Sequence, residues 1–429
     1  MTLTVAPRTD RLLAPDLARG LMLALIALAN SVVYLYGRPY GVRQHIVESG
    51  LADRIVSVLT VTLVDARAYP LFAALFAYGV VQLLQTKGRA YVRRRSLWLI
   101  AFGFAHALLL FPGDILGLYG LAGLVLLGRV SWLERGCGRA QIPPGGVPEK
   151  PGSNTGSQAS PGHHQTKSGP GLAPTPATKH GLGLTAVSDR KLLLAAAGWL
   201  VVVALVQGMA YAMPSDGGRS FFWSFEQTDP LRAMLLRPAE WLMTPFGVLG
   251  VGSAILVGTW AARRGILADP AAHRPLLVRT AVLGLTTAIA GGLPAGLAVG
   301  HFWTTSSLWA VNALHAVTGI AGGLGYAALI GLLAVRVGRR PGPVVRALAA
   351  CGQRSLSCYL FQSVVFVALL MPYGLGLGRT LGTGTVALLA LVTWAVSVGP
   401  AELLRRAGRQ GPAEILLRRL TRGTGRMAA

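Results

Sequence analysis

The stretch Ser307–Val335 reads SLWAVNALHAVTGIAGGLGYAALIGLLAV and contains no Asp, Glu, Lys or Arg. The hydrocarbon core of a bilayer is about 30 Å thick, and an α-helix needs about 20 apolar residues to cross it. The stretch therefore predicts a transmembrane helix. It is one of ten such stretches, which run approximately over Gly20–Tyr36, Ala68–Leu84, Ser96–Pro112, Ile115–Leu133, Lys191–Met213, Trp241–Ala261, Leu276–Gly300, Ser307–Val335, Leu356–Pro372 and Gly384–Leu404.

The composition of the whole chain agrees with a membrane protein. Of its 429 residues, 52% are hydrophobic and only 13% are charged, whereas a soluble domain carries about a quarter charged residues. Long apolar runs exclude disorder of the whole chain, and three cysteines are too few for a disulfide framework. We predict an all-α, polytopic helix bundle with about ten transmembrane helices.

Two shorter features modify this picture. Ile55–Ala66 is too short to cross a bilayer, so we expect an interfacial or re-entrant helix that leads into the next span. The sequence Gly291-Gly292-Leu293-Pro294 and the pair Gly319 and Gly323 fall inside two predicted spans. They permit close helix packing or a bend, and interrupted spans of this kind are typical of transporters.

The distribution of charge predicts the orientation. With ten spans, both termini lie on one side, and that side receives 32 of the 40 Lys and Arg but only half of the 16 Asp and Glu. The whole excess charge of +24 therefore falls on the face that bears the termini, which the positive-inside rule assigns to the cytoplasm. Basic residues beside the spans contact anionic lipid headgroups there, so the charge requires no nucleic-acid partner.

The chain divides into four parts. Residues 1–135 hold the first four spans and residues 190–404 the other six, and between them residues 136–189 form a flexible Pro/Gly/Ser-rich cytoplasmic linker. His163, His164 and His180 lie in this linker, where we expect solvated histidines and a metal site is the alternative. Residues 405–429 form a basic cytoplasmic tail, in which Gly411–Leu420 predicts a short interfacial helix.

Several short motifs along the chain, weak singly, carry a resemblance when taken in order. They are Asp16-Leu17-Ala18-Arg19-Gly20, Leu71-Phe72-Ala73-Ala74-Leu75-Phe76, Gly103-Phe104-Ala105-His106, Gly113-Asp114-Ile115-Leu116, the run Gly352–Ser363, Gly374-Leu375-Gly376-Leu377 and Gly411-Pro412-Ala413-Glu414. In these motifs the chain resembles the YeiB-like family, also known as domain of unknown function 418. That family is related to transmembrane acyltransferases, so the resemblance implies a multi-pass fold and an acyltransferase-like activity.

Only two of the eight histidines, His106 and His315, lie inside predicted spans. Each is six or seven residues from the outer end of its helix, a depth of about 9–10 Å at 1.5 Å per residue. The two rings could share one pocket open to the outer face and transfer protons there, or each could simply bind a neighbouring helix. Asp114 follows His106 by eight residues and could orient this histidine or cap the next helix. We predict His106, His315 and Asp114 as catalytic.

Other charged groups at the mouths of the spans are candidates for binding. A coenzyme A thioester would need cations for its phosphates. The candidates for this role are Arg19, Arg93, Arg94, Arg95, Arg263 and Arg264, for which anchoring to the membrane surface is the simpler explanation. At the outer mouths, Asp65, Arg67 and Glu240 could bind a polar acceptor, or could be solvated interface residues.

These observations predict a plasma-membrane protein that moves an acyl group from a cytoplasmic thioester donor, such as acyl-CoA, to an envelope acceptor. The acceptor would be a small molecule, a glycan or a lipid, and no bound cofactor is expected. This activity rests mainly on the resemblance. Two alternatives stay open, a multi-pass transporter of a small molecule and a non-catalytic membrane scaffold.

Overall fold

The computed structural model describes residues 13–138, 187–211, 217–338 and 341–422. Most of the linker expected at residues 136–189, with its three histidines, lies outside these ranges. The described residues form α-helices joined by short turns and 3₁₀ segments, and pair as strands only at one isolated bridge, Tyr40–Ile46. The helices are α1 (Leu13–Ser31), α2 (Leu51–Leu63), α3 (Ala68–Lys87), α4 (Arg89–Leu109), α5 (Ile115–Gly138), α6 (Asp189–Ala210), α7 (Pro230–Trp241), α8 (Thr244–Arg263), α9 (Arg274–Val299), α10 (Leu308–Val337), α11 (Pro343–Gln353), α12 (Ser355–Leu370), α13 (Thr383–Arg406) and α14 (Pro412–Arg422).

The predicted all-α membrane fold is confirmed. Among the described residues, seven helical segments are long and apolar enough to cross a membrane, or eight if the bent pair α11–α12 counts as one span. A helix covers each of the ten predicted spans. However, α4 begins with arginines that make it less apolar, and the apolar part described for α5 is short. The number ten therefore stays a prediction.

The segment expected to be an interfacial or re-entrant helix has a different arrangement. Helix α2 packs along α9, and together with α3 it forms one 37-residue apolar segment, Leu51–Lys87. Leu51, Ile55 and Leu59 lie four residues apart on the exposed face of α2, as expected of a helix that faces lipid. The α2–α3 segment is therefore one interrupted span, broken between Val64 and Arg67.

Glycine and proline do not interrupt α9 or α10. Both helices run unbroken through these residues. The glycines instead make room for the break in the neighbouring span. A Cβ atom on Gly292 would lie 2.0 Å from the Arg67 guanidinium, and one on Gly319 would lie 2.3 Å from the Ala66 carbonyl oxygen. Ala66 itself has a positive φ of 56°. The backbone therefore turns sharply at Ala66, next to the space left by the missing side chains of these glycines.

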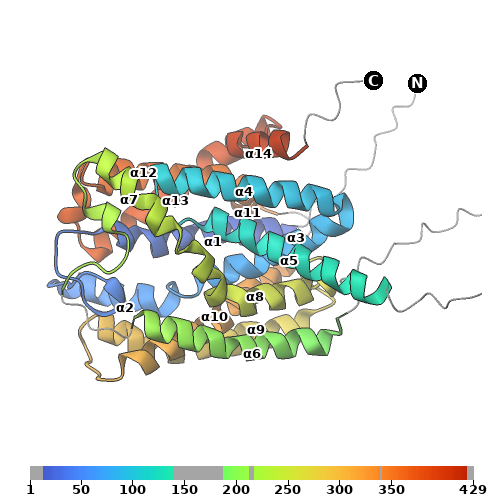
Figure 1. The fold of residues 1–429 in the computed structure, drawn as a ribbon, viewed down its shortest axis with the longest axis horizontal. Helices are drawn as coiled ribbons and strands as arrows, with labels where there is room; N and C mark the ends of the chain where they lie inside the picture. The colour runs from blue at the N-terminus through green and yellow to red at the C-terminus, as the bar shows by residue number, and fades with distance from the viewer. Residues whose placement is uncertain (1–12, 139–186, 212–216, 339–340, 423–429) are drawn as a thin grey trace, which may run out of the picture. The chain divides into compact units, whose positions relative to one another are not determined.

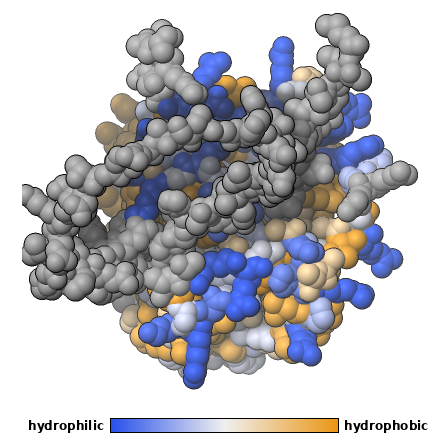
Figure 2. Space-filling view, turned by 90° about the vertical axis from the view of Figure 1, so that its right-hand side faces the viewer, coloured by the Kyte–Doolittle hydropathy of each residue, from blue (hydrophilic) through white to orange (hydrophobic). Residues whose placement is uncertain are grey.

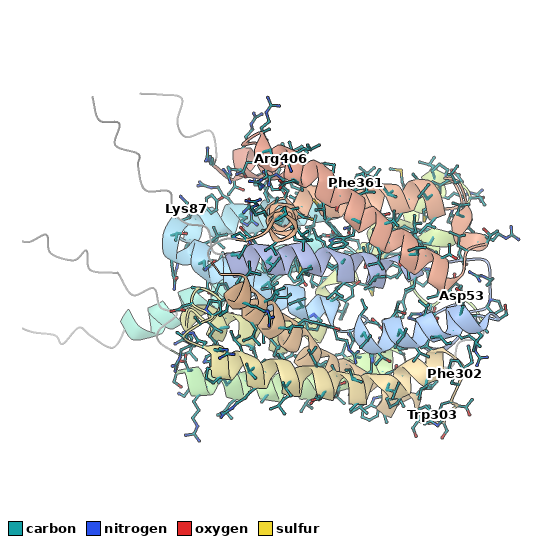
Figure 3. The ribbon with its side chains drawn as sticks, turned by 180° about the vertical axis from the view of Figure 1, so that it is seen from behind. Asp53, Lys87, Phe302, Trp303, Phe361 and Arg406 are labelled. Atoms are coloured by element: carbon teal, nitrogen blue, oxygen red, sulfur yellow. The ribbon has the colours of Figure 1, made fainter. Side chains whose placement is uncertain are left out.

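The helices on both sides of the undescribed linker pack into one compact body. Its two ends differ in composition. Lys87 and Arg406 lie towards one end, while Asp53, Phe302 and Trp303 lie at the other (Figure 3). Hydrophilic side chains gather on the Lys87 end, with apolar side chains around them (Figure 2). These ends correspond to the predicted inner and outer faces.

Two of the motifs behind the resemblance meet at a tight crossing of α1 with α11. A Cβ atom on Gly352 would lie 1.8 Å from the Asp16 carbonyl oxygen, and one on Gly20 would lie 2.1 Å from the Leu348 carbonyl oxygen. The Gln353 side-chain amide also donates to the Asp16 carboxylate at 2.9 Å. Directly after this crossing the chain bends by 84° into α12, so the crossing fixes where α12 begins.

Candidate functional site

A chain of three hydrogen-bonded side chains lies buried between α4, α5 and α12. The His106 Nδ1 atom is 2.9 Å from Asp114 Oδ1, and the His106 Nε2 atom is 2.9 Å from Ser363 Oγ. All three residues are no more than 4% exposed. The same order, carboxylate to imidazole to hydroxyl, occurs in the serine-histidine-aspartate arrangement of acyl-transferring enzymes.

The partners determine where the protons lie. An ionised carboxylate only accepts hydrogen bonds, and Asp114 Oδ2 already accepts the Gly117 N–H at 2.6 Å. Asp114 Oδ1 therefore accepts a hydrogen bond from the His106 Nδ1–H group. This leaves the lone pair of Nε2 towards Ser363, whose hydroxyl donates to it. The imidazole is thus set as a base that faces a hydroxyl group.

Local sequence explains how His106 and Asp114 meet. Helix α4 ends at Leu109, and Pro112 and Gly113 carry the chain through a tight turn into α5. Asp114 stands directly before α5, so its carboxylate caps that helix through Gly117 while it also contacts His106. The contacts needed for both predicted roles of Asp114, capping α5 and orienting His106, are therefore made by one side chain.

Glycines bring the two helices close enough for this contact. A Cβ atom on Gly103 would lie 2.2 Å from the Gly117 nitrogen and 2.3 Å from Asp114 Oδ2. Any larger residue at position 103 would push α4 away from α5, since backbone and the carboxylate already occupy this space. In the motif Gly103-Phe104-Ala105-His106, Gly103 thus lets α4 approach α5, and this approach positions His106 against Asp114.

Tyr359, one helical turn before Ser363, packs against His106 with 4.9 Å between the ring centroids. It is only 3% exposed. Its hydroxyl lies near the backbone of Ile115, whose N–H can only donate, and the hydroxyl proton has no acceptor within hydrogen-bond distance among the described residues. A buried donor without an acceptor costs free energy. Tyr359 also lines the cavity described next, so its hydroxyl is a donor available to a molecule bound there.

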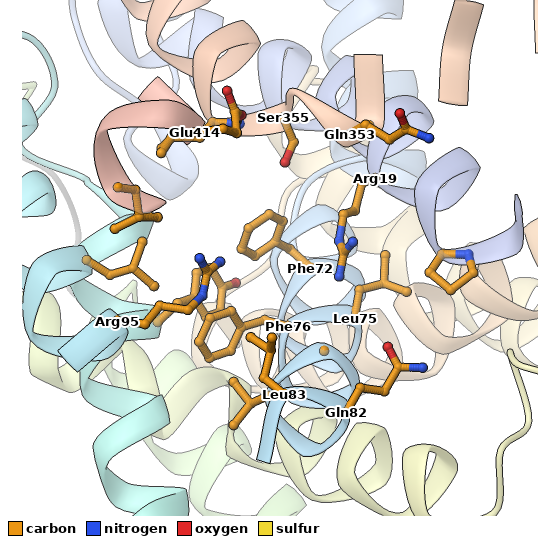
Figure 4. A pocket seen from close by; sticks show the side chains of 18 of the residues that line it. Arg19, Phe72, Leu75, Phe76, Gln82, Leu83, Arg95, Gln353, Ser355 and Glu414 are labelled. Atoms are coloured by element: carbon orange, nitrogen blue, oxygen red, sulfur yellow. The ribbon is translucent and has the colours of Figure 1, made fainter. Parts of the chain in front are cut away.

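A cavity of about 700 Å³ lies between α1, α3, α4, α5, α12 and α14. Its polar lining comes from residues of the predicted inner side, among them Arg19, Arg95, Gln353, Glu414 and Arg418. Figure 4 shows the Arg19 and Arg95 guanidinium groups reaching into the open space from different walls, with Phe72 and Phe76 nearby.

The other parts of the lining are apolar and aromatic, including Leu23, Leu99, Ile115 and Tyr119. Ile115 follows Asp114 in the chain, and Tyr359 packs on His106, so this apolar part approaches the three-residue chain. The cavity therefore has three arginines and the carboxylates of Asp16 and Glu414 at its polar part, and an apolar region that leads towards the histidine. This composition suits an amphiphilic anion.

Helix α14 forms part of the cavity wall through Glu414, Leu417 and Arg418. Glu414 Oε1 accepts the backbone N–H groups of Leu356 and Ser357 at 2.8 and 3.1 Å, and its Oε2 accepts the Ser357 hydroxyl. The carboxylate thereby caps the free N–H groups at the start of α12. The helix predicted over Gly411–Leu420 forms, and this contact holds it against the cavity.

His315 lies in a different cluster, at the break between α2 and α3. Arg67 Nη1 is 3.0 Å from His315 Nδ1 and 2.7 Å from the Asp65 carbonyl oxygen, and His315 Nε2 is 3.5 Å from Asp65 Oδ2. Arg43 completes the cluster through Asp65 Oδ2 at 2.8 Å and Asn312 Oδ1 at 3.0 Å. The two intramembrane histidines thus share no partner, and neither lines the described cavity.

Both ring nitrogens of His315 face charged groups. Arg67 Nη1 lies 3.0 Å from Nδ1 and 3.2 Å from Nε2, and Nε2 is 3.5 Å from Asp65 Oδ2. His315 therefore joins α10 to the break between α2 and α3, and its catalytic role stays a prediction. The expectation of one pocket that holds both histidines and opens to the outer face does not describe this arrangement.

The remaining predicted binding residues are scattered. Glu240 accepts the backbone N–H and the hydroxyl of Ser224 at 2.8 and 2.7 Å, away from Asp65 and Arg67. Arg263 and Arg264 both pair with Asp189, at 3.2 and 2.6 Å, and so join the ends of α8 and α6. Arg93 and Arg94 are exposed and do not line the described cavity. Of the six predicted donor-binding arginines, only Arg19 and Arg95 line it.

Sequence reasoning missed Ser363 and Tyr359. Both stand in the run Gly352–Ser363 that carries the resemblance, yet no pattern in the sequence linked them to His106. Among the described residues, no group of three or more His, Cys, Asp and Glu side chains is placed to hold a metal ion.

Comparison with known proteins confirms the resemblance to the YeiB-like family. Residues 261–424 match the sequence model of a family described as protein of unknown function (DUF418). The uncharacterized protein YeiB of Escherichia coli strain K12 is 47% identical over 55 residues, 13% of this chain and 14% of that protein. The uncharacterized protein YxaH of Bacillus subtilis strain 168 is 30% identical over 129 residues, 28% of this chain and 32% of that protein. The chain thus spans about a third or less of the curated relatives it matches.

Proposed function

Because residues 261–424 belong to the DUF418 family, which has no assigned activity, we propose a function from the site: the protein is a membrane acyltransferase. It takes an acyl group from a thioester donor that enters the cavity from the cytoplasmic side. It delivers this group to a hydroxyl or amine at the outer face or within the bilayer of the plasma membrane. The acceptor is a small molecule, a glycan or a lipid.

The single observation that carries the proposal is the hydrogen-bonded chain of Asp114, His106 and Ser363 beside the apolar part of the cavity. Acyl transfer needs a base that takes a proton from the attacking group and returns it to the leaving group. His106 suits this role because Asp114 holds its tautomer and would stabilise the imidazolium that forms. A buried site strengthens both contacts, since water does not screen them.

The cavity supports a thioester with an anionic head and an apolar tail. Arg19 and Arg95 line the cavity and would supply cations to the phosphates of coenzyme A, since arginine pairs well with phosphate. Phe72, Phe76 and Tyr119 offer aromatic surface to an acyl chain. Arg19 also contacts Asp16 at 3.6 Å, and this ion pair would hold the guanidinium at the wall of the cavity.

The test is transfer by the purified full-length protein in liposomes, with radiolabelled acetyl-CoA and palmitoyl-CoA as donors and membrane lipids and glycans as acceptors. We expect transfer by the wild type and a loss of about 10²-fold to 10⁴-fold in His106→Ala, the contribution typical of a general base. His273→Ala is the matched control, since that histidine is partly exposed, stands directly before α9, and has its Nδ1 3.0 Å from the Asp269 carbonyl oxygen. Equal activity of wild type and His106→Ala, or no transfer at all, would refute the proposal.

Transport is the second candidate, and the break between α2 and α3 favours it. Transporters place charged groups at the ends of interrupted spans near the middle of the bilayer, and Asp65, Arg67 and His315 stand at such a break. Liposomes that take up a labelled solute without consuming any thioester would support transport instead. A scaffold would show neither activity.

A further inference from the structure

We propose that Ser363 accepts the acyl group covalently and carries it between donor and acceptor. This inference rests on the proposed acyl transfer and adds to it the residue that forms the intermediate. The reaction then has two halves, joined by an acyl ester on a buried serine of α12.

In the first half, Ser363 Oγ attacks the thioester carbonyl carbon while His106 Nε2 takes the hydroxyl proton. The carbon–sulfur bond breaks, and the thiolate leaves with that proton, which His106 returns to it. In the second half, a hydroxyl or amine of the acceptor attacks the ester carbonyl and gives its proton to His106. The bond to Oγ breaks, and the same proton restores the serine hydroxyl. No oxidant, reductant or metal is required.

The distances distinguish this role from the usual hydrogen bond of a helical serine to its own backbone. Serines in membrane helices commonly donate to the carbonyl one turn earlier, and Ser363 Oγ does lie 3.3 Å from the Tyr359 carbonyl oxygen. The His106 Nε2 atom is closer, at 2.9 Å. Since Asp114 holds the proton on Nδ1, Nε2 must accept, and the serine proton therefore points to the base that would remove it.

Tyr359 provides the route from the cavity to Ser363. It lines the cavity, packs against His106 and stands one helical turn from the serine. Its hydroxyl proton has no acceptor within hydrogen-bond distance among the described residues. In this proposal the thioester carbonyl reaches Oγ past the tyrosine ring, and the tyrosine hydroxyl donates to the developing oxyanion.

The test traps the intermediate in the full-length protein. Wild type, Ser363→Ala, Ser363→Cys and Ser57→Ala are incubated with radiolabelled acetyl-CoA and palmitoyl-CoA without acceptor, quenched rapidly and mapped by mass spectrometry. Ser57 is the matched control, because it is buried and donates to the carbonyl one turn earlier, but in α2. Thermal unfolding in detergent verifies that each variant is folded.

We expect label on Ser363 in the wild type and in Ser57→Ala, stable to neutral hydroxylamine as an ester is. Ser363→Cys should carry label at the same position that neutral hydroxylamine releases, as expected of a thioester. Ser363→Ala should carry none and lose transfer at least 10²-fold. Transfer that proceeds without label at position 363 in both wild type and Ser363→Cys overturns the inference alone. Neither label nor transfer in the wild type overturns the proposed function as well.

Discussion

At the scale of single residues, the account depends on Asp114, which performs two tasks with one carboxylate. One oxygen caps α5 through Gly117, and the other fixes the tautomer of His106. The substitution Asp114→Asn keeps the size of the side chain but removes its charge. Its amide oxygen can still serve one of the two contacts, whereas the NH₂ group cannot accept the other.

Asp114→Asn should therefore lower acyl transfer by about 10²-fold to 10⁴-fold, while the loss in stability stays near 1 kcal/mol, the usual worth of a helix cap. The measurement compares transfer rates with thermal unfolding in detergent. As a control, Asp229→Asn alters the carboxylate that caps α7 at Leu231, away from the site. Should Asp114→Asn lose activity only in proportion to unfolded protein, the carboxylate acts as a cap and the catalytic interpretation is wrong.

The sequence predicts half of this site, for a physical reason. His106 and Asp114 are eight residues apart across a helix-breaking turn, so local geometry alone brings them near each other. Ser363 stands 257 residues away, and its approach depends on how α12 packs after the bend at Arg354. Such a contact follows from tertiary packing, which no local pattern in the sequence reports.

At the scale of elements, the interrupted span α2–α3 is the feature that the sequence interpretation misplaced. Asp65 and Arg67 look like residues at the outer end of the span Ala68–Leu84, since charged residues commonly stand there. The structure continues that span outward through α2, and so the same residues lie at a break within it. Of the two roles predicted for the glycines of α9 and α10, close helix packing is present and a bend is not, and what packs against them is the break of another span.

Arg67 should hold this break together. It is fully buried and donates to the carbonyl oxygens of Asp65 and Ala288 at 2.7 and 2.6 Å, and to His315. We expect Arg67→Ala to destabilise the protein by about 2–6 kcal/mol, because it leaves two buried carbonyl oxygens without their donor, at about 1–3 kcal/mol each. Thermal unfolding in detergent measures this change.

Arg232→Ala is the control for that measurement. This arginine is largely exposed and lies 3.8 Å from Asp229, and exposed ion pairs contribute about 1 kcal/mol or less. Similar unfolding temperatures for Arg67→Ala and Arg232→Ala would show that the break does not depend on its buried guanidinium.

At the scale of the whole molecule, the proposed function gives the predicted inner and outer ends different roles. The cavity is lined by Gln85 and Thr86, which directly precede Lys87 at the end that the charge distribution assigns to the cytoplasm. The apolar part of the cavity leads from there towards His106, which lies in the last turn of α4, nearer the opposite end. In this proposal, a thioester donor that enters from the Lys87 end reaches His106, which lies closer to the opposite end of the molecule.

Sidedness of donor use tests this account most directly. The protein is reconstituted in liposomes, and an impermeant maleimide locates Lys87→Cys and Thr228→Cys, which are exposed at opposite predicted faces, in a background without native cysteines. Radiolabelled acyl-CoA is then supplied on one side only. The account predicts transfer when the donor is on the Lys87 side, none when it is on the Thr228 side, and none from either side in His106→Ala. Transfer from the Thr228 side, or transfer that survives His106→Ala, would contradict it.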